Sequence, residues 1–147
     1  MASHTRLFTE EWTPIARLNP GSQTVEQNTA RFDMGLYDRI VVILSVGTIS
    51  SNGTLDLDIE QHTAASGGSS KNVTGKSIVQ LTAAGTDSNK IVAINLAAEE
   101  LDIAGGYHFV SIEVTPATAA AIIGLLVLAG SATYEPVPTT NWDESLN

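Results

Sequence analysis

The chain contains one uninterrupted apolar run, AAAIIGLLVLA, and its length limits what the chain can fold into. Residues 119–129 are eleven residues without a polar side chain, about half of the ~20 that a membrane-spanning helix needs. Both alternating sets of side chains are apolar, so periodicity alone does not separate a buried helix from a buried strand. Pro116 before the run, the polar GSAT after it and strand-like neighbours favour a strand buried on both faces. We expect this strand at the centre of a sandwich or of a subunit interface.

A length of 147 residues fits one domain, for which about 68% of the unfolded chain's surface is buried on folding. The chain has no cysteine, which excludes disulfides, thiolate metal sites and cysteine nucleophiles. The first residues, MASHTRLFTEEW, lack the apolar core of a signal peptide, which predicts synthesis in a cytoplasm.

The net charge is −9, and all seven Lys and Arg residues lie at or before Lys90. Residues 91–147 carry seven carboxylates and no Lys or Arg. Affinity for nucleic acids and for anionic membranes comes mainly from cations, so we expect neither as a partner. The acidic surface is expected to serve solubility or to face a basic protein.

Further strands are predicted on both sides of turn signals. Residues 38–49, DRIVVILSVGTI, are rich in β-branched residues with apolar side chains on both faces, which predicts a second interior strand. Asn52-Gly53 predicts a hairpin into residues 54–61, which alternate between Leu55, Leu57, Ile59 and Asp56, Asp58, Glu60. Other strands are expected at residues 77–81, 90–96 and 107–114, the last stopped at Thr115-Pro116, with one helical turn within 97–106.

The remaining segments are predicted as loops and extended ends. Residues 62–76 are small and polar and predict an exposed loop. Residues 1–22, closed by a turn at Asn19-Pro20-Gly21-Ser22, are either an N-terminal arm or a first edge strand folded back on the domain. The predicted organisation is therefore an arm at 1–22, a β-sandwich domain at 23–134 and a C-terminal tail at 135–147.

Seven to nine predicted strands with at most one short helix indicate an all-β fold, an antiparallel β-sandwich with the jelly roll as one candidate topology. Two strands that are apolar on both faces suggest that a neighbouring subunit covers part of a sheet. A third layer formed by the chain's own arm is the alternative.

Catalytic and metal-binding patterns are missing from the sequence. His4, His62 and His108 have no metal-ligand spacing, and neither GxSxG nor a P-loop is present. The carboxylates Asp56, Asp58 and Glu60 repeat every ~6.6 Å on one strand face; a solvated face explains them, and calcium binding with residues 87–89 is the alternative. We expect no catalytic residue, no metal and no cofactor, and no enzyme.

Residues 87–136 carry a pattern of composition and order. Leu101-Asp102 leads to a strand with Gly106-Tyr107, then to the apolar strand of residues 119–128 and to Tyr134-Glu135-Pro136. This pattern resembles small structural proteins of tailed bacteriophages encoded beside the major capsid protein, a group of head decoration (cement) or minor capsid proteins. The likeness covers the last third to half of the chain.

The resemblance implies a non-enzymatic virion protein that binds and stabilises the assembled head through the major capsid protein. It implies homotrimers at local three-fold positions of the capsid surface, on particles assembled in the host cytoplasm. The predicted trimer seam is Ile122, Ile123, Leu125 and Val127, with ordinary core as the alternative. The predicted capsid contacts are the large anchors Phe8, Trp12 and Trp142.

Two other functions fit the sequence. One is a head-tail connector or tail subunit in which the same sandwich forms a ring. The other is a calcium- or sugar-binding β-sandwich module for host attachment.

Overall fold

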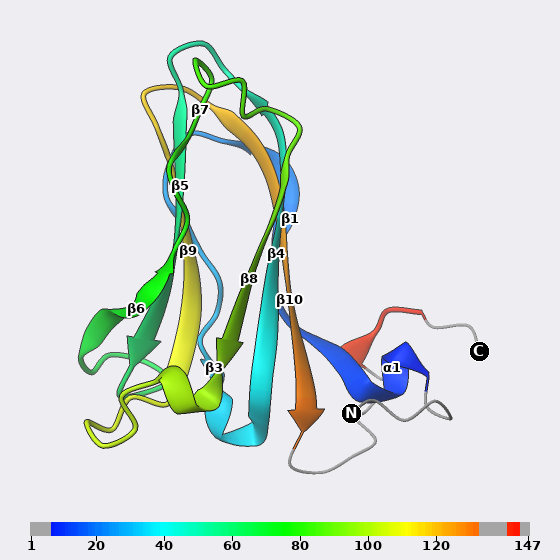
Figure 1. Ribbon diagram of the computed structural model, residues 1–147, viewed down its shortest axis with the longest axis vertical. Coiled ribbons are helices and arrows are strands. Elements are labelled where there is room, and N and C mark those ends of the chain that lie inside the picture. The colour runs from blue at the N-terminus through cyan, green and yellow to red at the C-terminus, as the bar shows by residue number, and fades with distance from the viewer. Residues whose placement is uncertain (1–6, 133–140, 145–147) are drawn as a thin grey trace.

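The computed structural model describes residues 7–132 and 141–144, which form two β-sheets packed face to face (Figure 1). The elements in chain order are α1 (Phe8–Glu11), β1 (Trp12–Gln23), β2 (Gln27–Asn28), β3 (Phe32–Asp33), η1 (Met34–Leu36), β4 (Tyr37–Ile49), β5 (Thr54–His62), β6 (Ser70–Ser77), β7 (Leu81–Thr82), β8 (Ile91–Ala97), η2 (Ala98–Glu100), β9 (Phe109–Ala117) and β10 (Ala121–Ala132).

One sheet has the strand order β1-β10-β4-β8, and the other has the order β2-β9-β5-β6, with β3 also on β9 and β7 also on β5. All of these pairs are antiparallel. The prediction of an all-β antiparallel sandwich is confirmed. Strands were also expected where β4, β8 and β10 lie, and the helical turn expected within 97–106 is η2.

The strand pairing is nested. β2 and β3 both pair with β9, and β6 and β7 both pair with β5, so each couple acts as one interrupted strand. The first strand then pairs with the last (β1 with β10), the second with the second last (β2 and β3 with β9), β4 with β8, and β5 with β6 and β7. Nested pairing of strands across two sheets is the jelly-roll arrangement.

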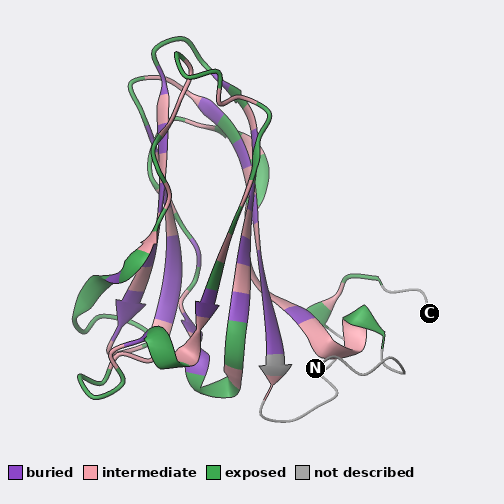
Figure 2. Ribbon diagram, in the orientation of Figure 1, coloured by how far each residue is buried: buried purple, intermediate pink, exposed green. Residues whose placement is uncertain are grey.

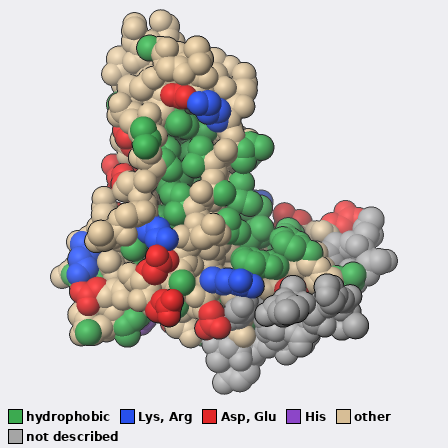
Figure 3. Space-filling view, viewed as in Figure 1, with side chains coloured by type: hydrophobic (Ala, Val, Ile, Leu, Met, Phe, Trp, Pro, Cys, Tyr) green, Lys and Arg blue, Asp and Glu red, His purple; other side chains and the backbone are tan. Residues whose placement is uncertain are grey.

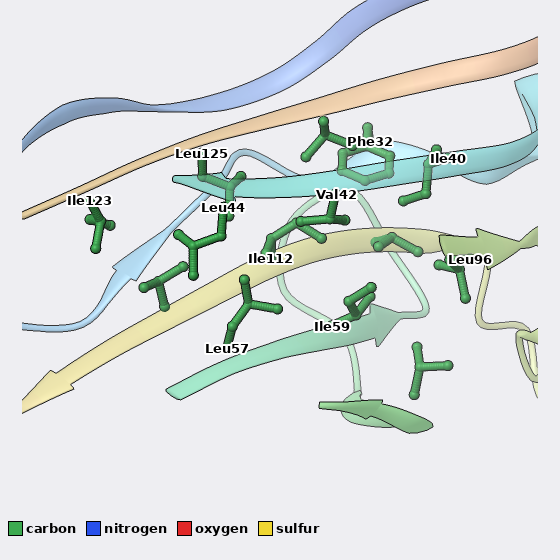
Figure 4. Close-up of a cluster of buried hydrophobic side chains, with 14 of the residues drawn as sticks. Phe32, Ile40, Val42, Leu44, Leu57, Ile59, Leu96, Ile112, Ile123 and Leu125 are labelled. Carbon is green, nitrogen blue, oxygen red and sulfur yellow. The ribbon is translucent and has the colours of Figure 1, made fainter. Parts of the chain in front are cut away.

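The core lies between the sheets, and Figure 2 shows buried residues along the long strands of both. Successive side chains of a strand point to opposite faces, so alternate residues of these strands enter the core. Figure 4 shows side chains of β4 and β10 facing those of β5 and β9. The fully or almost fully buried residues include Val42, Leu44, Ile123, Leu125, Leu57, Ile59 and Ile112. Burial of these side chains fixes the register of both sheets, since a slip by one residue would turn each of them outward.

The second half of the predicted arm is strand β1, at the edge of the four-stranded sheet. Pro14 and Pro20 lie within it, as an edge strand permits because one side of its backbone needs no hydrogen-bond partner. The turn predicted at residues 19–22 is wrong, because β1 passes through it with a register shift between Leu18 and Gly21. Of the two interpretations offered for residues 1–22, the edge strand describes residues 12–22.

The Asn52-Gly53 turn forms, but the hairpin predicted from it is wrong. Asn52 has φ 64° and the Gly53 N–H donates to the Ser50 carbonyl at 2.8 Å. However, β4 pairs with β10 and β8 in one sheet, while β5 pairs with β9, β6 and β7 in the other. Both edges of β4 are already occupied, so the turn carries the chain across the sandwich.

Three further boundaries differ from the prediction. The loop expected at residues 62–76 contains most of β6, because Val73, 2% exposed, packs inward between polar neighbours. Consequently β6 ends at Ser77, where a new strand was expected to begin. Strand β9 continues through Pro116, which pairs with Leu55, since β2 on its other side has ended opposite Val114.

Candidate interaction surface

The outward side of the four-stranded sheet carries apolar side chains from three of its strands. In cross-strand register, its side chains form rows whose members share one face. The rows, read from β10 through β4 to β8, are Gly124, Ser45, Ile91; Leu126, Ile43, Ala93; Leu128, Val41, Asn95; and Gly130, Arg39, Ala97. We call this surface, with Ile122 beside it, the apolar face. Figure 3 views the molecule along the edges of the sheets and shows hydrophobic side chains in the middle of this view and toward the side of the four-stranded sheet.

Exposure varies along the apolar face. Ile91 is 76% exposed and Ile122 is 46% exposed, whereas Leu128 is 6% exposed. The C-terminal residues Asn141, Trp142 and Asp143 line a shallow cleft with Leu126 and with residues 14–17 of β1. The chain's own ends therefore cover one end of the apolar face, and the end near Ile91 is open.

The predicted seam residues divide between the two sides of β10. Ile123, Leu125 and Val127 are 1%, 4% and 0% exposed and pack in the core, so the alternative of ordinary core describes these three. Ile122 lies on the outward side. Adjacent residues of a strand point to opposite faces, so one strand cannot present all four to a neighbour.

The predicted capsid contacts Phe8, Trp12 and Trp142 lie together. The Phe8 ring centroid is 6.3 Å from that of Trp12, in a stacked arrangement, and 6.3 Å from that of Trp142, tilted by 56°. Phe8 is 56% exposed, and the other two are half-buried. We call these three residues the aromatic cluster. Figure 1 shows α1 and residues 141–144 beside β1, on the side of the four-stranded sheet that faces away from the second sheet.

Trp12 connects the aromatic cluster to the apolar face. It pairs with Gly130, where a Cβ atom would lie 2.9 Å from the indole ring, so a residue without a side chain lets the ring lie flat on β10. The Arg39 guanidinium lies 5.1 Å from the ring centroid, a cation–π contact. The Trp142 indole N–H is buried without a hydrogen-bond partner among the described residues.

Charge on the apolar face is sparse and positive. The four rows contain Arg39, β1 adds Arg17 opposite Leu126, and neither set contains a carboxylate. Arg17 forms an exposed ion pair with Asp143, with 3.7 Å between nitrogen and oxygen, and exposed pairs of this kind contribute little to stability. The face is thus distinct from the rest of a chain whose net charge is −9.

The outward side of the other sheet is acidic. Asp56, Asp58 and Glu60 alternate with core residues along β5, and Glu113 of β9 lies opposite Asp58. We call these four residues the acidic face. Burial raises the pKa of the Glu113 carboxyl, and the negative charges of Glu26, Glu60 and Asp58 raise it further. Its carboxylates therefore repel one another.

A buried polar cluster lies at one end of the same sheet. His62, 2% exposed, places Nδ1 2.6 Å from the Ser70 hydroxyl and Nε2 2.7 Å from the Ser111 hydroxyl. The Arg31 guanidinium donates to the carbonyls of Ala64 at 3.0 Å and Gly67 at 2.6 Å, which holds the β5–β6 loop in place. Burial lowers the pKa of His62, and the Arg31 charge lowers it further. The ring is therefore held neutral, with both nitrogens satisfied.

The residues considered for metal binding have protein partners. Asp87 accepts from the Thr82 N–H at 2.9 Å and pairs with Lys90, and Asp56 accepts from the Gln80 side chain at 2.7 Å. Asp58 accepts from Ser77. Within residues 7–132 and 141–144, no group of three or more His, Cys, Asp or Glu side chains is placed to hold a metal ion. His4 and Tyr134-Glu135-Pro136 lie outside the described residues.

No helix among the described residues is long and apolar enough to cross a membrane.

The sequence pattern did not show that Val41, Ile43, Ile91, Leu126 and Leu128 lie on the outward side of the sheet. The signal was present, because residues 38–49 and 119–129 are apolar on both faces. Which of the two alternate sets points outward depends on pairing with strands far away in the sequence, and that pairing is visible only in the fold.

No protein-family model matches the chain, and no curated protein matches it. Among solved structures, a chain from the structure of infectious bursal disease virus, Gx strain, is similar over 85% of this chain, with a TM-score of 0.45 and 13% sequence identity. This chain spans about a third, 33%, of the length of that viral chain.

Proposed function

We propose that this chain is a structural virion protein of a tailed bacteriophage, a decoration protein that binds the assembled head through the major capsid protein and stabilises it. In this proposal it acts without catalysis, on the capsid surface. The observation that carries the proposal is the apolar face. A jelly roll of this size needs only one apolar side per sheet, yet β4 and β10 are apolar on both.

Exposed apolar area supports this proposal through its free-energy cost. Each Å² of apolar surface left in water forgoes about 25 cal/mol, and contiguous apolar patches on soluble proteins generally mark contact sites. Ile91 and Ile122 are among the exposed large hydrophobic residues, and both lie on this one face. A protein partner removes that surface from water.

The aromatic cluster supplies the second part of the argument. Tryptophan and arginine dominate binding energy at protein interfaces, and Trp12 and Arg39 are stacked at one end of the apolar face. Residues 8, 12 and 142 come from both ends of the chain. A partner that binds the aromatic cluster therefore contacts residues from both the N-terminal and the C-terminal segments.

The test is the stability of phage heads with and without the protein. A protein that binds only the assembled shell stabilises it by RT ln(1 + [L]/Kd) at each site, so heads assembled without the chain should rupture at a lower temperature and recover when it is added. Trp12→Ala should weaken this recovery, while Val79→Ala, far from the aromatic cluster in sequence and 89% exposed, should not. Equal rupture temperatures with and without the chain would refute the proposal.

Copy number separates decoration from the connector alternative. A decoration protein is present at many equivalent positions of the head, whereas a connector forms one ring. Quantitative gel densitometry of purified particles against the major capsid protein gives the ratio. If the ratio corresponded to a single ring per head, the chain would be a connector, and the apolar face would be the contact surface of that ring.

A further inference from the structure

A groove crosses the open end of the apolar face. Its floor is the row of Gly124 and Ser45, and Gly47 lies at its edge. Its walls are Pro20, which lies over Gly124, Ile122, which lies over Gly47, and Ile91 at the edge of the sheet. We call this the Ile91 groove. Small residues on its floor and branched apolar residues on its walls suit a large apolar side chain.

The opposite end of the same face carries such a side chain. Phe8 is 56% exposed and stands on a four-residue helix above Trp12, which pairs with Gly130. The groove row begins at Gly124, six residues along β10 from Gly130, a distance of about 20 Å at the rise of a strand. Phe8 therefore does not reach the groove of its own chain.

Charge near the two ends is complementary. Glu10 and Glu11 lie in the same short helix as Phe8. Lys90 lines the groove, with its side chain 49% exposed and paired to Asp87. A helix that brought Phe8 into the groove would bring carboxylates toward this ammonium group, where opposite charges attract.

We propose that the Ile91 groove receives Phe8 of a second copy of this chain. This inference deepens the proposed function, because it names the occupant of the open part of the apolar face. The rows of the apolar face bear no carboxylate, and at the groove the Lys90 side chain, 49% exposed, is more accessible than its partner Asp87, 16% exposed, so copies with a net charge of −9 meet there with little like-charge repulsion. A reciprocal contact makes a pair of chains, and a head-to-tail contact makes a ring.

Disulfide cross-linking tests the contact directly, because the chain contains no cysteine. Purified Thr9→Cys and Ser45→Cys variants of the full chain, which keep Phe8 and Ile91, are mixed under mild oxidation and compared with a mixture of Thr9→Cys and Val79→Cys. Ser45 and Val79 are both exposed, so accessibility of the thiol alone does not favour the first mixture. We expect the first mixture to form the mixed disulfide about tenfold faster or more, since a contact raises the effective concentration of the two thiols.

Light scattering at several concentrations provides the second readout. The wild-type mass should rise above 15.4 kDa with concentration, and Phe8→Ala and Ile91→Lys should each shift the association to higher concentration while circular dichroism shows that both remain folded. Equal cross-linking rates in the two mixtures, or a wild-type chain that stays monomeric, would overturn the inference.

The two proposals fail separately. A chain that cross-links faster between Thr9→Cys and Ser45→Cys but does not raise the rupture temperature of heads keeps the groove contact and loses the decoration role. A chain that stabilises heads but shows equal cross-linking rates keeps the decoration role and loses the groove contact.

Discussion

The two outward faces of this sandwich differ although both sheets contribute the same kind of side chain to the core. On β5, apolar residues point inward and Asp56, Asp58 and Glu60 point outward. On β4 and β10, apolar residues point both ways. A strand whose apolar and polar side chains alternate needs a covering layer on one face only. A strand that is apolar on both faces needs a covering layer on each. The second layer over β4 and β10 is only partly supplied by the chain's own ends.

The contrast also determines what each face can meet. The acidic face holds carboxylates that already raise the pKa of Glu113 by crowding, after the effect of burial, so it opposes another copy of an acidic chain. The rows of the apolar face contain Arg39 and no carboxylate, and Arg17 of β1 lies beside them. Association of like chains is therefore expected on one side of the sandwich.

The sharpest test of inner against outer uses two adjacent isoleucines of β10. Ile123→Ala should lower the free energy of unfolding by about 2–5 kcal/mol, because Ile123 is 1% exposed and its removal leaves a cavity in the core. Ile122→Ala should lower it by under about 1 kcal/mol, because Ile122 is 46% exposed and its truncation leaves no cavity in the core. Urea unfolding of both variants gives the comparison.

Each variant is the control for the other, because both remove the same atoms from adjacent isoleucines that point to opposite faces of β10. If Ile122→Ala were as destabilising as Ile123→Ala in the isolated chain, the division of β10 into an inner and an outer side would be wrong.

Trp12→Ala should have the next largest effect, a loss of about 1–3 kcal/mol. The substitution removes a half-buried indole that stacks with Phe8, lies over Gly130 and makes a cation–π contact with Arg39. Arg39→Gln is the matched variant, because it removes only the cation and should cost about 0.5–1 kcal/mol. Thermal unfolding of the two variants measures both values, and an equal loss would mean that the ring contributes through the cation alone.

The sequence predicted most of the strands because their patterns are local. Residues 38–49 and 54–61 have the two-face and one-face patterns of an interior and a half-buried strand, and both form. Strand β6 was missed because its one buried residue, Val73, is surrounded by Ser, Lys, Asn, Thr and Gly. The hairpin at Asn52-Gly53 was wrong because a turn signal fixes local φ and not the sheet that each strand joins.

The candidate site was predictable only in part. Phe8, Trp12 and Trp142 could be chosen as large anchors, but their meeting depends on β1 lying beside β10. Ile91 belongs to an ordinary strand pattern in the sequence, and its 76% exposure follows from the position of β8 at the sheet edge. Surface position is a property of the nested pairing, which joins residues 98 to 118 positions apart in the case of β1 and β10.

The stability of the fold should depend on pH through His62 of the buried polar cluster. The pKa of His62 is lowered in the folded chain by burial and by Arg31, whereas the unfolded chain has the ordinary value of 6.5. Below that pH the unfolded state binds the additional proton, so wild-type stability is retained above about pH 6.5 and falls as the pH drops toward the lowered value. Glu60 and Arg31 are the charged groups nearest to the ring.

Melting temperatures at pH 7.5 and 5.5 test this titration. His62→Gln should show a smaller drop between the two pH values than the wild type, while its stability at pH 7.5 decreases because two serine hydroxyls lose a partner. Val79→Ala, which changes an exposed residue without a titratable group, is the control and should keep the wild-type drop. An unchanged drop in His62→Gln would assign the acid sensitivity to the carboxylates.

The smallest expected effect belongs to Glu113. Its folded pKa is raised, so the folded state binds a proton more readily than the unfolded state, and the charged carboxylate lowers stability at pH values above the raised pKa. Glu113→Gln removes the charge opposite Asp58 and should raise stability at pH 7 by about 0.2–1 kcal/mol, an increase that added salt reduces because salt screens like charges. Glu99→Gln is the control, because Glu99 is exposed and is not among the charges that raise the pKa of Glu113. If the two substitutions had equal effects, the repulsion on the acidic face would be a general property of the net charge rather than of this cluster, and the contrast with the apolar face would be one of hydrophobicity alone.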